Sequence, residues 1–156
     1  MSTNTPLSPE QALQRLRHYC AHSERCHNDV IKKLYDLSVW QKYHDEILTS
    51  LIEDNFLNEE RYAKLFVGGH FRQKQWGRKK IRYHLKQKGI SEYCIKAAMK
   101  EIDEADYLEV LQQLFTKKWK SLSGNKFAKM KKTNDFLVQK GFEPELINQC
   151  FENMEP

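Results

Sequence analysis

The sequence predicts an all-α protein in which three tandem three-helix repeats form an elongated, curved array. Apolar residues recur at helical spacing along most of the 156-residue chain, and the alternation typical of β-strands is almost absent. The chain holds only six Gly and four Pro, which disfavours a loop-rich β-sandwich. A block of residues also recurs at a constant distance along the chain, which indicates repeated helical units.

The predicted repeats have similar lengths, and each is expected to hold three helices. The expected boundaries divide the chain into a disordered N-terminal tail of residues 1–7 and repeats of residues 8–57, 58–103 and 104–156. Each repeat is near the lower size limit for a domain that folds alone. Neighbouring repeats must therefore help to bury its apolar face. The alternative is one compact helical bundle in which the repetition arises by chance.

Helix-start and helix-stop residues support the elements in order. Residues that suit the start of a helix stand at Ser8-Pro9, Ser23, Asn58, Ser91 and Pro144. A third helix of the first repeat is expected over residues 42–55, and the first helix of the last repeat over residues 104–119. Gly89 and Gly141 suit the C-terminal end of the second helix in the last two repeats.

The repetition is clearest around these two glycines. A leucine, a glycine and an isoleucine recur 52 residues apart, as Leu85, Gly89 and Ile95 and again as Leu137, Gly141 and Ile147. The first repeat has a related turn without glycine, Leu37-Ser38-Val39. We therefore expect the leucine and isoleucine positions in the core and a left-handed glycine between them.

Basic residues are unevenly distributed along a chain whose formal net charge is +5. Residues 72–88 and residues 117–132 are both rich in Lys and Arg and contain no acid. Arg78, Arg82 and Lys86 have the spacing of a stripe along one helix face. Either block could be an ordinary solvated face, but two related blocks favour a surface that binds a polyanionic or acidic partner. The candidate binding residues are Arg72, Lys74, Arg78, Lys79, Arg82, Lys86, Lys117, Lys118, Lys126 and Lys129.

No catalytic grouping is recognisable in the sequence, and we expect neither enzymatic activity nor a cofactor. The HExxH, GxSxG and Walker patterns are all absent. Cys20, His22, Cys26 and His27 are of zinc-ligand type, but their spacing does not match the usual paired form, so buried thiols are the favoured interpretation. No apolar run spans a bilayer and residues 1–6 lack the pattern of a secretory leader, which predicts a cytoplasmic protein.

Four segments resemble the RecX family of regulatory proteins. They comprise residues 20–24 with 29–34, residues 51–63, residues 77–90, and residues 136–142 with Ile147. The resemblance implies three three-helix modules and a non-enzymatic protein that lodges in the helical groove of the RecA–DNA filament. It further implies inhibition of filament growth, ATP turnover, strand exchange and LexA cleavage.

Two functional hypotheses follow. The first is a monomeric inhibitor that contacts several RecA protomers at once through an elongated surface. The second is a direct DNA-binding protein built of helix-turn-helix-like modules, in which the basic blocks contact the DNA backbone. The sequence leaves open whether the basic stripe faces RecA or DNA.

Overall fold

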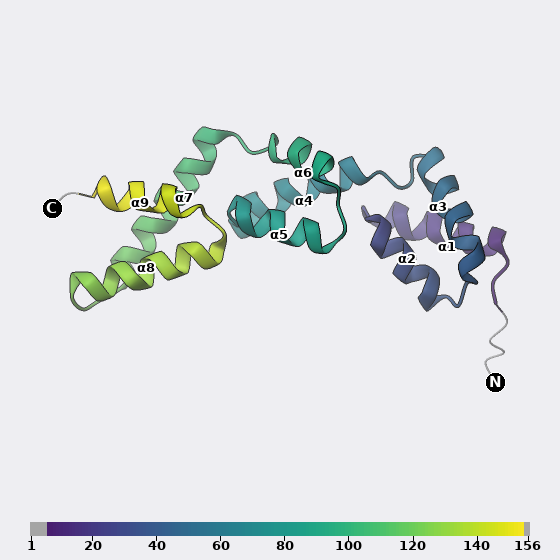
Figure 1. The fold of residues 1–156 in the computed structure, drawn as a ribbon, viewed down its shortest axis with the longest axis horizontal. Coiled ribbons are helices and arrows are strands. Elements are labelled where there is room, and N and C mark those ends of the chain that lie inside the picture. The colour runs from purple at the N-terminus through teal and green to yellow at the C-terminus, as the bar shows by residue number, and fades with distance from the viewer. Residues whose placement is uncertain (1–5, 155–156) are drawn as a thin grey trace.

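The computed structural model describes residues 6–154, and these residues form nine α-helices, one short 3-10 helix and no β-strand. The first unit holds α1 (Pro9–His22), α2 (His27–Asp36), the 3-10 helix η1 (Gln41–Tyr43) and α3 (His44–Glu53). The second unit holds α4 (Glu59–Lys74), α5 (Arg78–Gln87) and α6 (Glu92–Met99), and the third α7 (Glu104–Ser121), α8 (Lys126–Lys140) and α9 (Pro144–Glu152). The three groups of helices follow one another along the long axis of the molecule (Figure 1). The prediction of an all-α, elongated, curved array of three-helix repeats is confirmed.

Most of the predicted helix starts are confirmed by their capping hydrogen bonds. The Gln11 amide donates to Ser8 Oγ at 3.2 Å, and the Ser8 amide donates back to Gln11 Oε1 at 3.0 Å. The Arg61 amide donates to Asn58 Oδ1 at 2.8 Å, and the Cys94 amide donates to Ser91 Oγ at 3.3 Å. Each cap satisfies an amide that has no partner inside its own helix.

The prediction that Ser23 caps the second helix is wrong. Ser23 lies at the C-terminal end of α1, and the N-cap of α2 is Cys26. The Cys26 amide donates to Asp29 Oδ2 at 3.1 Å, so the third residue of α2 supplies the capping oxygen. Sequence reasoning favoured the serine because its hydroxyl is the more usual cap. Of the predicted tail, residues 1–5 lie outside the described residues, and Leu7 packs against the first core.

The same turn closes the second helix of every unit. The residue after the turn donates its amide to the leucine carbonyl five positions earlier: Val39 to Leu34 at 3.0 Å, Ile90 to Leu85 at 3.1 Å and Phe142 to Leu137 at 3.2 Å. The turn residue has positive φ in each case, +77° at Gly89, +102° at Gly141 and +59° at Ser38. The expected left-handed glycines are therefore confirmed. The first unit makes the same turn with a serine, whose backbone is strained because a residue with a Cβ adopts positive φ at a cost.

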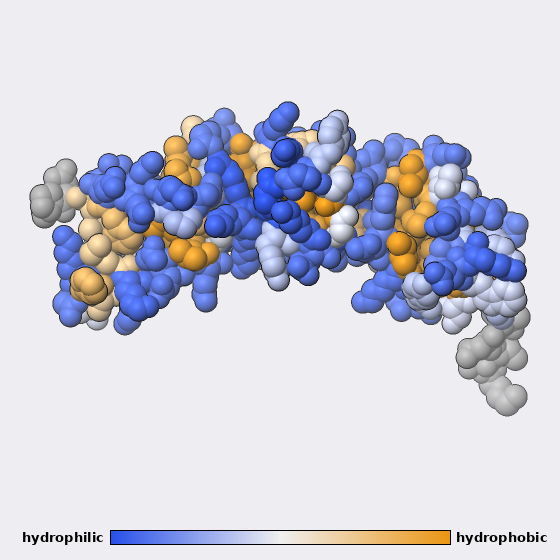
Figure 2. Space-filling model, in the orientation of Figure 1, coloured by the Kyte–Doolittle hydropathy of each residue, from blue (hydrophilic) through white to orange (hydrophobic). Residues whose placement is uncertain are grey.

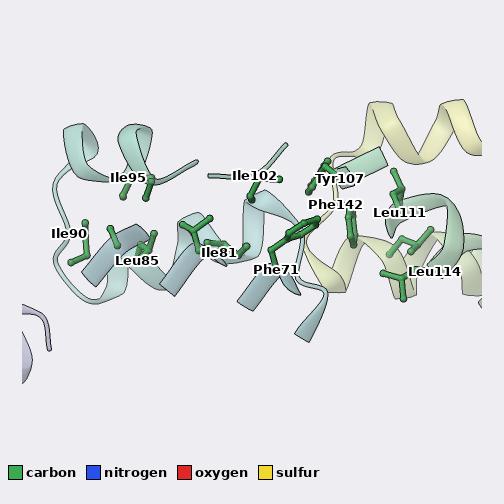
Figure 3. Close-up of a cluster of buried hydrophobic side chains, with 14 of the residues drawn as sticks. Phe71, Ile81, Leu85, Ile90, Ile95, Ile102, Tyr107, Leu111, Leu114 and Phe142 are labelled. Carbon is green, nitrogen blue, oxygen red and sulfur yellow. The ribbon is translucent and has the colours of Figure 1, made fainter. Parts of the chain in front are cut away.

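Two hydrophobic cores lie inside the array. One belongs to the first unit alone, and the other runs without a break through the second and third units (Figure 3). Phe71, Tyr107 and Phe142 join the two parts of the longer core, with ring centroids 5.8 Å apart for Phe71 and Tyr107 and 5.2 Å apart for Tyr107 and Phe142. The leucine and isoleucine positions of the repeat are fully buried at Leu85, Ile95, Leu137 and Ile147, as predicted. Outside the cores, hydrophilic residues cover most of the face seen in Figure 2.

The contact between the first and second units, hereafter the first junction, is small and polar. Lys88 Nζ lies 3.2 Å from Asp29 Oδ1, and Arg61 Nε lies 2.5 Å from Glu24 Oε1. A Cβ on Gly89 would come within 2.6 Å of Asn28 Nδ2, so the turn after α5 packs closely against the start of α2. Cys26 is the one residue of the first unit that belongs to the longer core.

Candidate interaction surface

The second junction, between the second and third units, is built from backbone. The start of α5 meets the end of α8, where the Gly77 amide donates to the Lys140 carbonyl at 2.7 Å and the Lys79 amide donates to the Gly141 carbonyl at 2.9 Å. A Cβ on Gly77 would lie closer than 3.0 Å to the backbone of Gly141 and Phe142. These bonds satisfy groups that each helix end leaves without an internal partner. They also hold the two units in one fixed relation.

Arg78 reinforces this junction rather than projecting freely into solvent. Its guanidinium lies 2.7 Å from Glu143 Oε2, is also paired with Glu104, and stacks 3.8 Å from the ring centroid of Tyr107. The Tyr107 hydroxyl accepts from the Arg78 amide at 2.9 Å and donates to Glu143. Burial and the bond to Glu143 raise the pKa of Tyr107, so it remains a hydroxyl that can donate. Burial would lower the pKa of Arg78, but its bonds to Glu143 leave that pKa raised.

The other two members of the predicted stripe face one acid. Arg82 pairs with Glu92, and Lys86 Nζ lies 3.9 Å from the other oxygen of the same carboxylate. The hydrogen bond from Arg82 lowers the pKa of Glu92. The stripe therefore exists along α5, but Arg78 and Arg82 already have internal counter-charges, and Lys86 is its most exposed member.

Trp76 is half-buried in an aromatic cluster at the end of α4. Its ring centroid lies 6.5 Å from Phe66 and 4.6 Å from both His70 and His84. Burial lowers the pKa of His70, whose Nδ1 lies 2.8 Å from the Phe66 carbonyl oxygen. The cluster fixes the position of the indole.

Two lysines lie over the face of Trp76. The Nζ atoms of Lys74 and Lys80 are 5.4 and 4.4 Å from its ring centroid. A cation near an aromatic face is attracted by the electron density of the ring, so the indole holds both ammonium groups near the second junction. Lys74 was predicted as a binding residue, whereas Lys80 was not among the candidates.

Two clefts with basic linings flank the end of α8. The α5 cleft, of about 410 Å³, is lined by Lys79, Lys80, Tyr83, His84, Val138, Gln139, Gly141, Phe142 and Pro144. The α7 cleft, of about 320 Å³, is lined by Gln75, Leu114, Lys117, Lys118, Ser121, Phe136 and Lys140. No acid lines either cleft, and each combines lysines with aromatic side chains. This composition suits an acidic or phosphate-bearing partner.

The structure brings some of the predicted residues together and separates others. Lys74, Lys79, Lys117 and Lys118 lie around the second junction with Lys80 and Lys140, which sequence reasoning missed. The position of Lys140 could have signalled its role, because it repeats Lys88 immediately before the glycine.

The remaining predicted residues lie elsewhere. Arg72 is part of a separate, mixed-charge cleft with Arg61 and Glu101. Lys126 and Lys129 belong to the first turn of α8, about 20 Å from its C-terminal end at the rise of an α-helix. Lys129 Nζ lies 4.4 Å from the ring centroid of Trp119.

The described residues show no group of three or more His, Cys, Asp or Glu side chains arranged to hold a metal ion. Cys20 and Cys26 are buried, and burial raises the pKa of each thiol above its ordinary value. Between residues 6 and 154, no helix has the length and apolar character needed to cross a bilayer.

Comparison with family models decides the identity of the chain. Residues 58–99 match the second three-helix domain of RecX, and residues 104–151 match the third. The chain belongs to the RecX family. The two matched RecX domains are the units that share the longer core, so the second junction lies between them.

Curated RecX proteins are similar over most of the chain. The chain is 29% identical over 138 residues to "Regulatory protein RecX" of Bacillus cytotoxicus, and 28% identical over 138 residues to that of Bacillus mycoides. Each match covers 88% of this chain and 51% of the relative, so the chain spans about half the length of the curated relatives it matches. The family is one of regulatory proteins, not an enzyme family.

Solved RecX structures have the same fold. A crystal structure of regulatory protein RecX matches with a TM-score of 0.86 at 23% identity, covering 93% of this chain and 73% of the other. RecX from Lactobacillus salivarius matches with a TM-score of 0.84 at 23% identity, covering 92% of this chain and 94% of the other. These similarities show that all three units are arranged as in other RecX proteins.

Proposed function

We propose that this chain is a negative regulator of homologous recombination and of the SOS response that binds the RecA–DNA filament in its helical groove. In that position it inhibits filament extension, ATP hydrolysis, strand exchange and LexA cleavage, and catalyses no reaction itself. Membership of the RecX family supports the proposal, together with the resemblance noted in the sequence. The protein acts in the cytoplasm as a monomer.

The elongated array is the observation that carries this proposal. Its three units follow one another along one axis, and the second junction holds two of them rigidly (Figure 1). A rigid, extended body can contact several protomers of a helical polymer at once. Weak contacts then add up, because each further contact forms at high effective concentration. Such a body blocks a groove that a small globule would not fill.

The basic surface supplies the complementary charge in this proposal. In this proposal the candidate residues face acidic groups of the filament or the DNA backbone. The exposed candidates are Arg72, Lys74, Lys79, Lys86, Lys117 and Lys126, and the half-buried ones are Lys118 and Lys129. Arg78 and Arg82 contribute mainly by holding α5 in place, since their guanidinium groups are already paired.

DNA-dependent ATP hydrolysis by the cognate RecA tests the proposal. Substoichiometric amounts of this protein should slow hydrolysis on single-stranded DNA, because one bound molecule blocks a growing filament. A large molar excess that leaves the rate unchanged would show the proposal to be wrong. Repeating the assay with excess DNA provides the control, since a protein that only sequesters DNA loses its effect when more DNA is present.

Direct DNA binding is the second candidate function, and the two acid-free clefts favour it. Their lysines could contact phosphates while Tyr83 and Phe136 stack on bases. Six or more phosphate contacts would lower the affinity by roughly 10³ or more between 50 and 200 mM salt. A fluorescence anisotropy titration with labelled DNA at both salt concentrations measures this slope. Absence of binding at the lower concentration excludes this function.

A further inference from the structure

The two junctions of the array repeat one geometry but differ in charge. In both, the lysine–glycine end of a second helix packs against the start of the second helix in the preceding unit. Lys88-Gly89 packs on the start of α2, and Lys140-Gly141 packs on the start of α5. Asp29 and Lys80 are each the third residue of the helix that receives this contact. A lysine therefore stands in the second junction where the first has an aspartate.

Asp29, the aspartate of the first junction, makes two interactions. Its carboxylate accepts from the Cys26 amide at 3.1 Å and lies 3.2 Å from Lys88 Nζ. Burial would raise the pKa of Asp29, but these bonds leave that pKa lowered, so the carboxylate is charged at neutral pH. The first junction thus contains its own ion pair.

In the second junction, backbone carbonyl oxygens accept both of the corresponding hydrogen bonds, so no negative charge compensates the lysine ammonium groups. The Gly77 amide donates to the Lys140 carbonyl, and Lys140 Nζ donates to the Lys74 carbonyl at 2.9 Å. Among residues 6–154, no carboxylate lies within 4.0 Å of the ammonium group of Lys74, Lys80 or Lys140. Burial, and then the charge of Lys80, lower the pKa of Lys140. Like charges are held together there without a counter-ion.

We propose that the second junction binds an acidic side chain of a partner protein, whose carboxylate takes the place that Asp29 occupies in the first junction. The site comprises Lys80 and Lys140, with Trp76 holding Lys80 in position and the α5 cleft receiving an apolar neighbour of the acid. The cleft favours a peptide over a nucleic-acid strand, because the exposed Val138 and Pro144 offer apolar contact beside a small number of charges. This inference rests on the proposed function, since it names the kind of filament group that would dock here.

A titration of this protein tests the site without RecA. The probe is a short peptide of glutamate and phenylalanine. Its binding is followed by ¹H–¹⁵N NMR through the signals of the Trp76 indole and the Gly141 amide. The glutamate peptide should shift both signals in a saturable way, and the matching glutamine peptide should not. No shift with the glutamate peptide overturns the proposal. Oligothymidylate that shifts the same signals at lower concentration than the peptide also overturns it, in favour of a nucleic-acid site.

Lys80→Asp is the decisive variant, because it supplies internally the carboxylate that the partner is proposed to supply. The substituted acid would pair with Lys140, and it stands in the first turn of α5, where the helix dipole favours a negative charge. The variant should keep or raise its melting temperature while its affinity for the glutamate peptide falls about tenfold, equivalent to about 1.4 kcal/mol. Lys80→Met provides a second test, since it keeps an apolar stem on Trp76 and removes only the charge.

Lys32→Asp is the matched control, with the same change in net charge on an exposed face of α2. It should bind the peptide as the parent does, and peptide binding by Lys80→Asp at the parental affinity overturns the proposal. The two proposals can fail separately. A parent protein that does not slow ATP hydrolysis by RecA refutes the proposed function, whereas equal inhibition by the parent and by Lys80→Asp refutes only the junction site.

Discussion

Gly77→Ala isolates the contribution of the backbone contact at the second junction. Gly77 has φ of −76°, which alanine adopts without strain, so the effect comes from the added Cβ alone. That Cβ would lie closer than 3.0 Å to three backbone atoms of the turn after α8, and backbone cannot rotate aside as a side chain can. The two units must separate at this point. The hydrogen bonds from the Gly77 and Lys79 amides would then lengthen or break.

The expected loss is about 2–4 kcal/mol in the free energy of unfolding, from two hydrogen bonds at about 1–2 kcal/mol each when their groups stay partly buried. Urea denaturation followed by circular dichroism measures it. Gly69→Ala is the control, because nothing lies within 4 Å of the added Cβ and the position is inside α4. It should stabilise the protein by up to about 1 kcal/mol through helix propensity. A Gly77→Ala protein as stable as the parent would show that the glycine contact does not hold the units together.

Four further substitutions test the repeat and its environment. Ser38→Gly should raise the free energy of unfolding by about 1 kcal/mol, because φ of +59° strains a residue with a Cβ; a lower stability in urea denaturation would contradict this account. Leu85→Ala and Leu137→Ala should each lower the free energy of unfolding by about 2–5 kcal/mol, because each leaves a cavity at a fully buried site. A loss outside this range for only one of the two variants would show that the two positions are not equivalent. Burial lowers the pKa of His70 below its ordinary 6.5, so the unfolded chain binds the proton more readily than the folded chain does. The stability of the protein should therefore fall as the pH drops from 7.5 to 5.5. Thermal denaturation at several pH values measures this dependence, and His70→Gln should make it weaker.

The repeat positions and most helix starts were predictable because their signals are local. The capping box at Ser8 lies within four residues, and the turn at Gly89 depends on the one residue type that adopts positive φ freely. The exception at Ser23 has a different origin, because a contact with a distant part of the chain contributes there. Two possible caps lay a few residues apart, and the contact of Cys26 with the core of the next unit favoured the later one.

The binding surface was predictable only in part. The sequence identified the acid-free blocks that supply Lys74, Lys79, Lys117 and Lys118 to the second junction. It also assigned Arg78 to an exposed stripe, although Glu143, which lies 65 residues away along the chain, pairs with its guanidinium. Helical spacing predicts which side chains share a face, but it does not predict which distant acid packs against that face.

The sequence by itself determined the helices, their threefold repetition and the total charge, because these depend on residue type and on spacing within a few turns. Only the tertiary structure decided which lysines remain without a counter-ion. Lys88 and Lys140 stand at equivalent positions, yet Lys88 pairs with Asp29, whereas Lys140 donates to the Lys74 carbonyl and has no ion pair among the described residues. Electrostatic energy depends on distance in space, and packing sets that distance for residues far apart in the chain.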